Sequence, residues 1–110
     1  LTVGVYGENE EYKAFAEQFT AKHPEYGANI FVYLCYDALK LLEYGIETSQ
    51  SLDSEKIRDA IEGATDVDLF TDHHFSVDPA THNPLNKMVE IVGFKNGEFY
   101  LVDEFYPSMG

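Results

Sequence analysis

The longest apolar stretch of the chain runs from Asn29 to Thr48 and reads NIFVYLCYDALKLLEYGIET. Its apolar residues recur at steps of three and four positions, which places them along one face of an α-helix. The residues of this face are Ile30, Phe31, Leu34, Ala38, Leu41 and Leu42, and Val32, Cys35, Leu39 and Ile46 widen it. A helix that is apolar nearly all round requires partners on more than one side. We therefore expect this helix to be buried in the middle of a core.

Two further stretches have the spacing of amphipathic helices, at about 9–22 and about 54–63. The first has acidic residues in its opening turn, where the helix dipole favours them, and Asn9 stands where a capping residue is expected. Its apolar stripe consists of Tyr12, Phe15, Ala16 and Phe19. In the second, Asp53 is the expected N-cap and Gly63 the expected stop. The segment Pro24–Gly27 is typical of a turn between the first two helices.

The rest of the chain contains patterns typical of strands. Asn96 and Gly97 form the dipeptide that most strongly indicates a two-residue hairpin turn, because both residues tolerate positive φ. The predicted strands are Thr2–Tyr6, Phe75–Val77, Met88–Phe94 and Phe99–Phe105. The last two flank the turn and carry apolar residues on both faces, so we expect another element to cover them.

Composition narrows the range of partners. The chain has 110 residues, of which 20 are acidic and 7 basic, giving a formal charge of −13. This charge repels phosphate backbones and anionic lipid headgroups, so neither nucleic acid nor an anionic membrane surface is expected as partner. Cys35 is the only cysteine, which excludes an internal disulfide, and its place in the most apolar helix predicts a small buried side chain.

Nothing at the start of the chain indicates a targeting segment. No apolar run approaches the roughly 18 residues of a membrane span, and the opening residues lack the basic region of a signal peptide. The chain also begins within a predicted strand and without Met. We expect it to be a piece of a longer protein.

The chain has one cluster of metal-ligand residue types, formed by Asp72, His73 and His74 with Asp78 and His82 nearby. Adjacent histidines on an extended chain point to opposite faces, so this cluster favours a solvated loop over a metal site. Asp66-x-Asp68 lacks the oxygen ligands and glycine that a calcium loop needs further on. The sequence also lacks the nucleotide-binding and nucleophile motifs. We therefore predict no catalytic residue, no metal and no cofactor.

Phe31 and Tyr33 are candidates for ligand binding because they open the central helix. The first N–H groups of a helix have no partner within the helix and can meet a carboxylate. Packing in the core is the other interpretation of both rings, and the sequence leaves the two open.

Seven features follow one another along the chain in a set order. They are Lys13-Ala14-Phe15, Pro24 with Tyr26, Tyr36-Asp37-Ala38, Leu52–Ile61, Phe75–Asp78, His82-Asn83-Pro84 with Lys87, and the Asn-Gly hairpin followed by Pro107. In this order the chain resembles, over nearly its whole length, the C-terminal third of the type I solute-binding proteins of branched-chain amino acid ABC importers.

The resemblance implies a two-lobed α/β fold that closes over an amino acid, without catalysis. Residues 1–110 would be a C-terminal segment of the ligand-binding domain that contributes to both lobes, with three helices and then a β-hairpin, incomplete on its own. Tyr33, with Phe31, would contact the ligand. The implied partners are an amino acid and an ABC permease, and the implied location is extracytoplasmic, either periplasmic or as a membrane-anchored lipoprotein. The segment by itself is expected to self-associate.

The chain departs from the family at two places. Val32, Tyr33 and Cys35 stand where the family usually has small residues, and Asp72-His73 stands where it usually has glycine. Because of the first departure, the resemblance does not identify the ligand. Because of the second, it does not fix the path by which this segment crosses between the lobes. Two other classes remain as alternatives. One is a stand-alone acidic α+β protein-interaction module, and the other is a metal-dependent hydrolase centred on Asp72, His73, His74 and His82.

Overall fold

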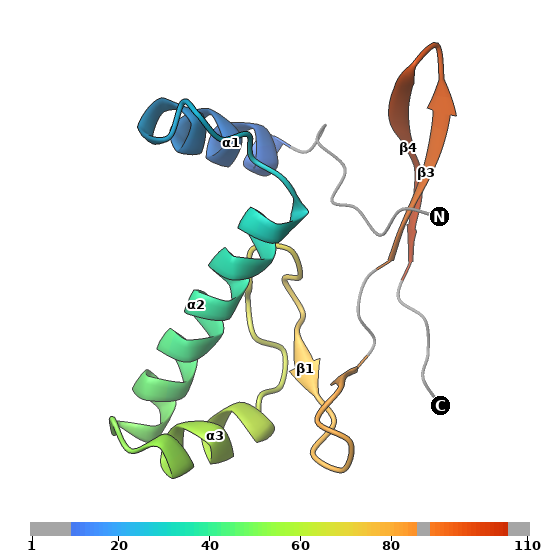
Figure 1. The fold of residues 1–110 in the computed structure, drawn as a ribbon. Helices are drawn as coiled ribbons and strands as arrows, with labels where there is room; N and C mark the ends of the chain where they lie inside the picture. Colours follow the sequence, from blue (N-terminus) through green and yellow to red (C-terminus); the bar gives the residue numbers. More distant parts are fainter. Residues whose placement is uncertain (1–9, 86–88, 106–110) are drawn as a thin grey trace.

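The structure is a computed structural model that describes residues 10–85 and 89–105. Three helices are followed by two small antiparallel sheets, so the fold is mixed α/β, as the sequence predicts (Figure 1). The expected strand Thr2–Tyr6 and the expected cap Asn9 lie outside the described residues. In the part that is described, no helix is long and apolar enough to cross a membrane.

The helices begin and end close to where local signals predict. They are α1 (Glu10–Lys22), α2 (Ile30–Ser49) and α3 (Ser54–Glu62). The Asp53 carboxylate accepts hydrogen bonds from the backbone N–H groups of Glu55 and Lys56, which confirms it as the N-cap of α3. Gly63 ends α3, and its N–H donates to the carbonyl of Asp59. The chain turns between α1 and α2 at 24–27, also as expected.

Helices α2 and α3 pack together at Gly45, which is buried on α2. A Cβ at this position would lie 2.9 Å from Cγ2 of Ile57 and 3.0 Å from Cγ1 of Ile61. The two helices approach this closely because Gly45 has no side chain to hold them apart.

The sheets follow the helices along the chain. β1 (Ser76–Val77) pairs with β2 (Pro84–Leu85), a strand that the sequence pattern did not predict. β3 (Val89–Lys95) and β4 (Glu98–Phe105) form the predicted hairpin, with Asn96 and Gly97 at φ 53° and 79° in its turn. In Figure 1 this hairpin stands apart from the helices for most of its length.

A cluster of buried apolar residues lies where α1, the start of α2 and the loop after α3 meet. Tyr12, Tyr33 and Phe70 form its centre, and Phe15 and Ala28 pack against it. We call these five residues the aromatic cluster. This cluster lies at one end of α2. The sequence led us to expect a core around the whole helix, and the structure does not place one there.

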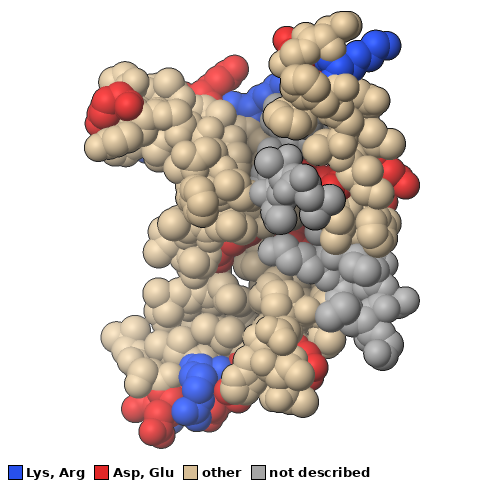
Figure 2. Space-filling view, turned by 45° about the vertical axis from the view of Figure 1, so that its right-hand side comes forward, with Lys and Arg blue, Asp and Glu red and all other residues tan. Residues whose placement is uncertain are grey.

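Much of the apolar surface is open. The apolar patterns of α2 and the hairpin favour burial, but a segment that resembles only part of a larger fold is expected to leave them uncovered when taken alone. Residues of β4 are exposed throughout, and on α2 Phe31, Leu39 and Leu42 are exposed at 73%, 65% and 44%. Uncharged side chains make up most of the face in Figure 2, with charged ones mainly toward its edges. The radius of gyration is 15.9 Å, against about 13 Å for a compact domain of about 100 residues.

The prediction that Cys35 is buried is wrong, because its side chain is exposed. Its position on the most apolar helix predicted a covered side chain, but Leu34 and Tyr36 on either side of it are also exposed, at 40% and 39%. The Tyr36 ring still contacts the rings of Phe15 and Phe70, with centroids 5.1 Å and 5.4 Å apart, so the apolar pattern of α2 led to contacts but not to full burial.

Candidate functional site

The aromatic cluster is built from rings that come from three separate parts of the chain. The Tyr12 ring stacks on Tyr33 with centroids 5.4 Å apart, and Phe70 lies 5.1 Å from Tyr12 and 5.8 Å from Tyr33. Phe15 adds contacts of 5.5 Å to Tyr33 and 5.1 Å to Phe70. Ring pairs at these separations attract one another beyond the burial of their surface. The cluster therefore joins α1, α2 and the loop after α3.

The two residues predicted to bind ligand have different environments: one side chain is buried and the other is exposed. Tyr33 is 7% exposed and belongs to the aromatic cluster, where burial raises the pKa of its hydroxyl. Phe31 is 73% exposed and does not belong to that cluster. Tyr33 thus has the packing role that the sequence left open, while Phe31 has a free ring. Contact of either residue with a ligand stays a prediction.

The start of α2 is less available to a carboxylate than the sequence suggested. Asn29 is the N-cap, and its side-chain oxygen accepts hydrogen bonds from the N–H groups of Phe31 at 3.0 Å and Val32 at 3.3 Å. The N–H of Tyr33 donates to the backbone carbonyl of Asn29. The expectation of several free N–H groups at this helix start is wrong, because the chain supplies its own cap.

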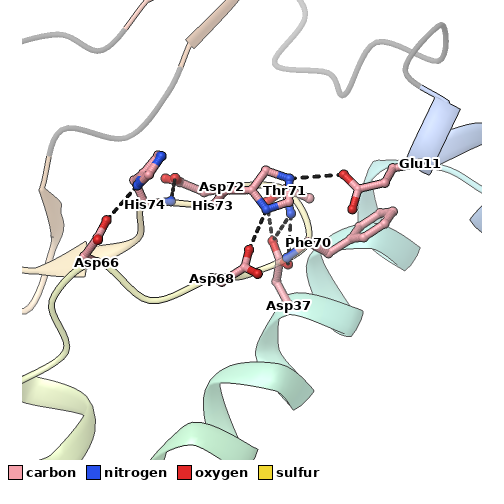
Figure 3. Close-up of polar contacts among 9 residues, drawn as sticks. All are labelled: Glu11, Asp37, Asp66, Asp68, Phe70, Thr71, Asp72, His73 and His74. Carbon is pink, nitrogen blue, oxygen red and sulfur yellow. Dashed lines mark hydrogen bonds and ion pairs between the residues drawn. The ribbon is translucent and has the colours of Figure 1, made fainter.

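A buried carboxylate on α2 holds the loop after α3. Asp37 is 7% exposed and accepts hydrogen bonds from the N–H of Phe70 at 2.7 Å and from the N–H of Thr71 at 3.1 Å (Figure 3). The Thr71 hydroxyl donates to its other oxygen. Asp37 positions Phe70, and through it the aromatic cluster. In the sequence, Tyr36-Asp37-Ala38 indicated only a family resemblance, and the signal for this role was a charged residue inside an apolar helical stretch.

Asp72 is a second buried carboxylate in the same loop. It is 2% exposed, so the expectation of a solvated loop is wrong for this residue. One of its oxygens accepts a hydrogen bond from the N–H of His74 at 2.9 Å, and the other, Oδ2, has no hydrogen-bond partner among the described residues. A buried acceptor without a partner is costly, which marks Asp72 as a place where a donor such as water would be favoured.

The histidines of the loop do not converge. His73 points toward Asp68 and Glu11, whereas His74 points toward Asp66, with Nδ1 2.7 Å from its carboxylate (Figure 3). His82 lies 3.4 Å from the carboxylate of Glu62. Within residues 10–85 and 89–105, no group of three or more histidine, cysteine or acidic side chains is placed to hold a metal ion.

The pKa values of this region follow from these contacts. The hydrogen bond with Asp68 raises the pKa of His73 above its ordinary value, the contact with Glu11 acts in the same direction, and partial burial opposes both. The same hydrogen bond lowers the pKa of the Asp68 carboxyl. Burial raises the pKa of the Tyr12 hydroxyl, and the surrounding carboxylates, Glu90 first among them, raise it further.

Comparison with known proteins gives one informative match. No protein-family model matches the sequence, and no curated protein sequence matches it either. Among solved structures, the leucine-binding protein LivK of Thermotoga maritima matches with a TM-score of 0.66 and 25% sequence identity. The match covers 92% of this chain and 28% of the LivK chain. The described fold is thus similar to part of a type I periplasmic-binding-protein-like fold.

Proposed function

We propose that this chain is part of a solute-binding protein that recognises an amino acid, without catalysis, and delivers it to an ABC-type importer. The observation that carries the proposal is the match of 92% of the chain to a leucine-binding protein. Because the chain spans 28% of that neighbour, the complete function requires further polypeptide. A protein that supplies an importer works outside the cytoplasm, so the proposal includes an extracytoplasmic location and a permease as partner.

The arrangement of residues is compatible with binding. The exposed ring of Phe31 at the start of α2 offers an apolar wall for an aliphatic side chain. The aromatic cluster beneath it includes Tyr33 and fixes the start of α2 against α1. Phe31 is therefore the better candidate for direct contact, and Tyr33 for support.

The test is calorimetric titration of the intact protein with leucine, isoleucine and valine, with glucose as a ligand of another class. We expect saturable binding of at least one amino acid and none of glucose. Absence of binding to all three amino acids, in a protein whose melting transition is cooperative, would contradict the proposal.

The Phe31→Ala variant locates the site. We expect weaker amino acid binding by about 1–3 kcal/mol with little change in melting temperature, because the ring is exposed. Leu39→Ala removes another exposed apolar side chain from the same helix and is expected to leave affinity unchanged. Tyr33→Ala distinguishes its two roles: retained affinity with an earlier melting transition assigns Tyr33 to the core alone.

A further inference from the structure

The imidazole of His73 lies between two carboxylates from different parts of the fold (Figure 3). Its Nδ1 is 2.5 Å from Oδ1 of Asp68 in the same loop, and its Nε2 is 3.1 Å from Oε2 of Glu11 on α1. An ionised carboxylate only accepts hydrogen bonds, whereas a neutral imidazole has a single N–H. Both contacts are hydrogen bonds only when both ring nitrogens carry a proton. This geometry therefore belongs to the positively charged ring.

We infer that His73 is a pH-sensitive clasp that joins α1 to the loop 68–75, closed when the ring is protonated and opened when it loses a proton. Glu11 directly precedes Tyr12, and the loop carries Phe70. The two ends of the clasp thus belong to the elements whose rings meet in the aromatic cluster. Opening it removes this polar contact between α1 and the loop, while the ring packing of Tyr12 on Phe70 remains. The inference goes beyond solute binding and does not depend on it.

The charges around the ring favour the protonated form. Asp68 on the loop and Glu11 on α1 contact the ring itself. The other charged or titratable groups of these packed elements are Asp66, Asp72 and His74 on the loop and Asp37 and Lys40 on α2. His74 contacts Asp66, and Lys40 acts on Asp68. Carboxylates outnumber the cations here, and two of them contact the ring directly.

The direction of the pH effect follows from linkage. The pKa of His73 in the folded chain is raised above the ordinary value of 6.5. Its contribution to stability is therefore complete below about pH 6.5 and is lost as pH rises through the folded pKa. The ring and both carboxylates are about half exposed or more, so the effect is local and moderate.

The experiment measures hydrogen exchange of the α1 amides in the intact protein at about pH 6 and about pH 8.5, each corrected for the intrinsic exchange rate. In the wild type we expect protection of α1 to fall by roughly 2- to 5-fold between the two pH values. Glu11→Gln removes the carboxylate that α1 contributes, so its protection should be low at both pH values. His82→Gln changes an exposed histidine that contacts α3 instead, and should retain the wild-type pH dependence.

Two results would overturn the inference. One is wild-type protection of α1 that does not change between the two pH values. The other is a Glu11→Gln variant that keeps the full decrease, since the clasp requires that carboxylate. Glu11 is about half exposed, so the variant is expected to fold. A failure of amino acid binding would bear on the proposed function and leave these measurements unaffected.

Discussion

Two buried carboxylates, Asp37 and Asp72, lie where α2 meets the loop after α3, and they differ in how many hydrogen bonds they accept. Asp37 on α2 receives hydrogen bonds from two backbone N–H groups and one hydroxyl of the loop. Asp72 in the loop receives one from the N–H of His74 and keeps an oxygen without a partner. A buried acceptor that is fully paired stabilises a fold, whereas an unpaired one costs free energy. Asp37 is therefore the stronger structural anchor of the two.

Asp37→Ala tests this anchor. The variant leaves the buried N–H groups of Phe70 and Thr71 without their acceptor, so we expect the free energy of unfolding to fall by about 2–4 kcal/mol. Thr71→Val removes only the hydroxyl and should cost less. Urea denaturation followed by tyrosine fluorescence measures both. A loss for Asp37→Ala no larger than that of an exposed Asp59→Ala control would contradict the anchoring role.

At the scale of elements, the helices and the hairpin follow from local signals. Asp53, Gly63 and the Asn96-Gly97 dipeptide act within a few residues of themselves, and the structure places each where the sequence predicts. Which elements pack against each other depends on residues that are far apart in the sequence. Helix α2 meets α3 through Gly45, a residue that the helical pattern alone did not distinguish from its neighbours.

Gly45→Ala is expected to destabilise the contact of α2 with α3. Its Cβ would lie within 3.1 Å of three side-chain atoms of Ile57 and Ile61, so these side chains or the helices must shift, at a cost of about 1–3 kcal/mol. Gly63→Ala is the matched control, because its Cβ would meet only ordinary contacts at 3.6 Å and beyond. Thermal melting of both variants provides the measurement. Equal melting temperatures for the two would show that the helices do not pack as closely as described.

At the scale of the whole molecule, the open surface of α2 and the hairpin is the main feature. Large apolar side chains on both are exposed, and the chain is more extended than a compact domain of its size. The match to 28% of a longer binding protein agrees with a chain that forms part of a larger fold. Contiguous apolar surface of this kind is rarely left in water.

The 110-residue chain produced alone is therefore expected to self-associate. Light scattering should give a mass above that of one chain. Replacing Leu39 and Leu42 by lysine, on the exposed face of α2, should lower that mass without lowering the melting temperature, because neither side chain is buried. Replacing Gln18 and Thr20 by lysine, at exposed polar positions of α1, adds the same charge and controls for it. A clean monomer for the unchanged chain would rule out this expectation.

Sequence alone determined the three helices and the hairpin, with boundaries close to those observed. Helical spacing, caps and the hairpin turn depend on hydrogen bonds and side-chain contacts between residues close in the chain. A short stretch of sequence is therefore enough to predict them. The resemblance to a solute-binding family also came from the order of such local features. The structural match with LivK supports that fold, while the ligand and the importer remain predictions.

Tertiary structure alone decided which residues are buried and which side chains meet. Asp37 contacts Phe70 across 33 positions, and His73 contacts Glu11 across 62. No local pattern encodes such pairs. Burial likewise depends on what packs against a helix face. On α2, Tyr33 is buried because α1 and the loop after α3 pack against it, whereas Phe31 and Cys35 are exposed. An apolar pattern states that a face favours burial, and only the packing of the chain supplies the partner that buries it.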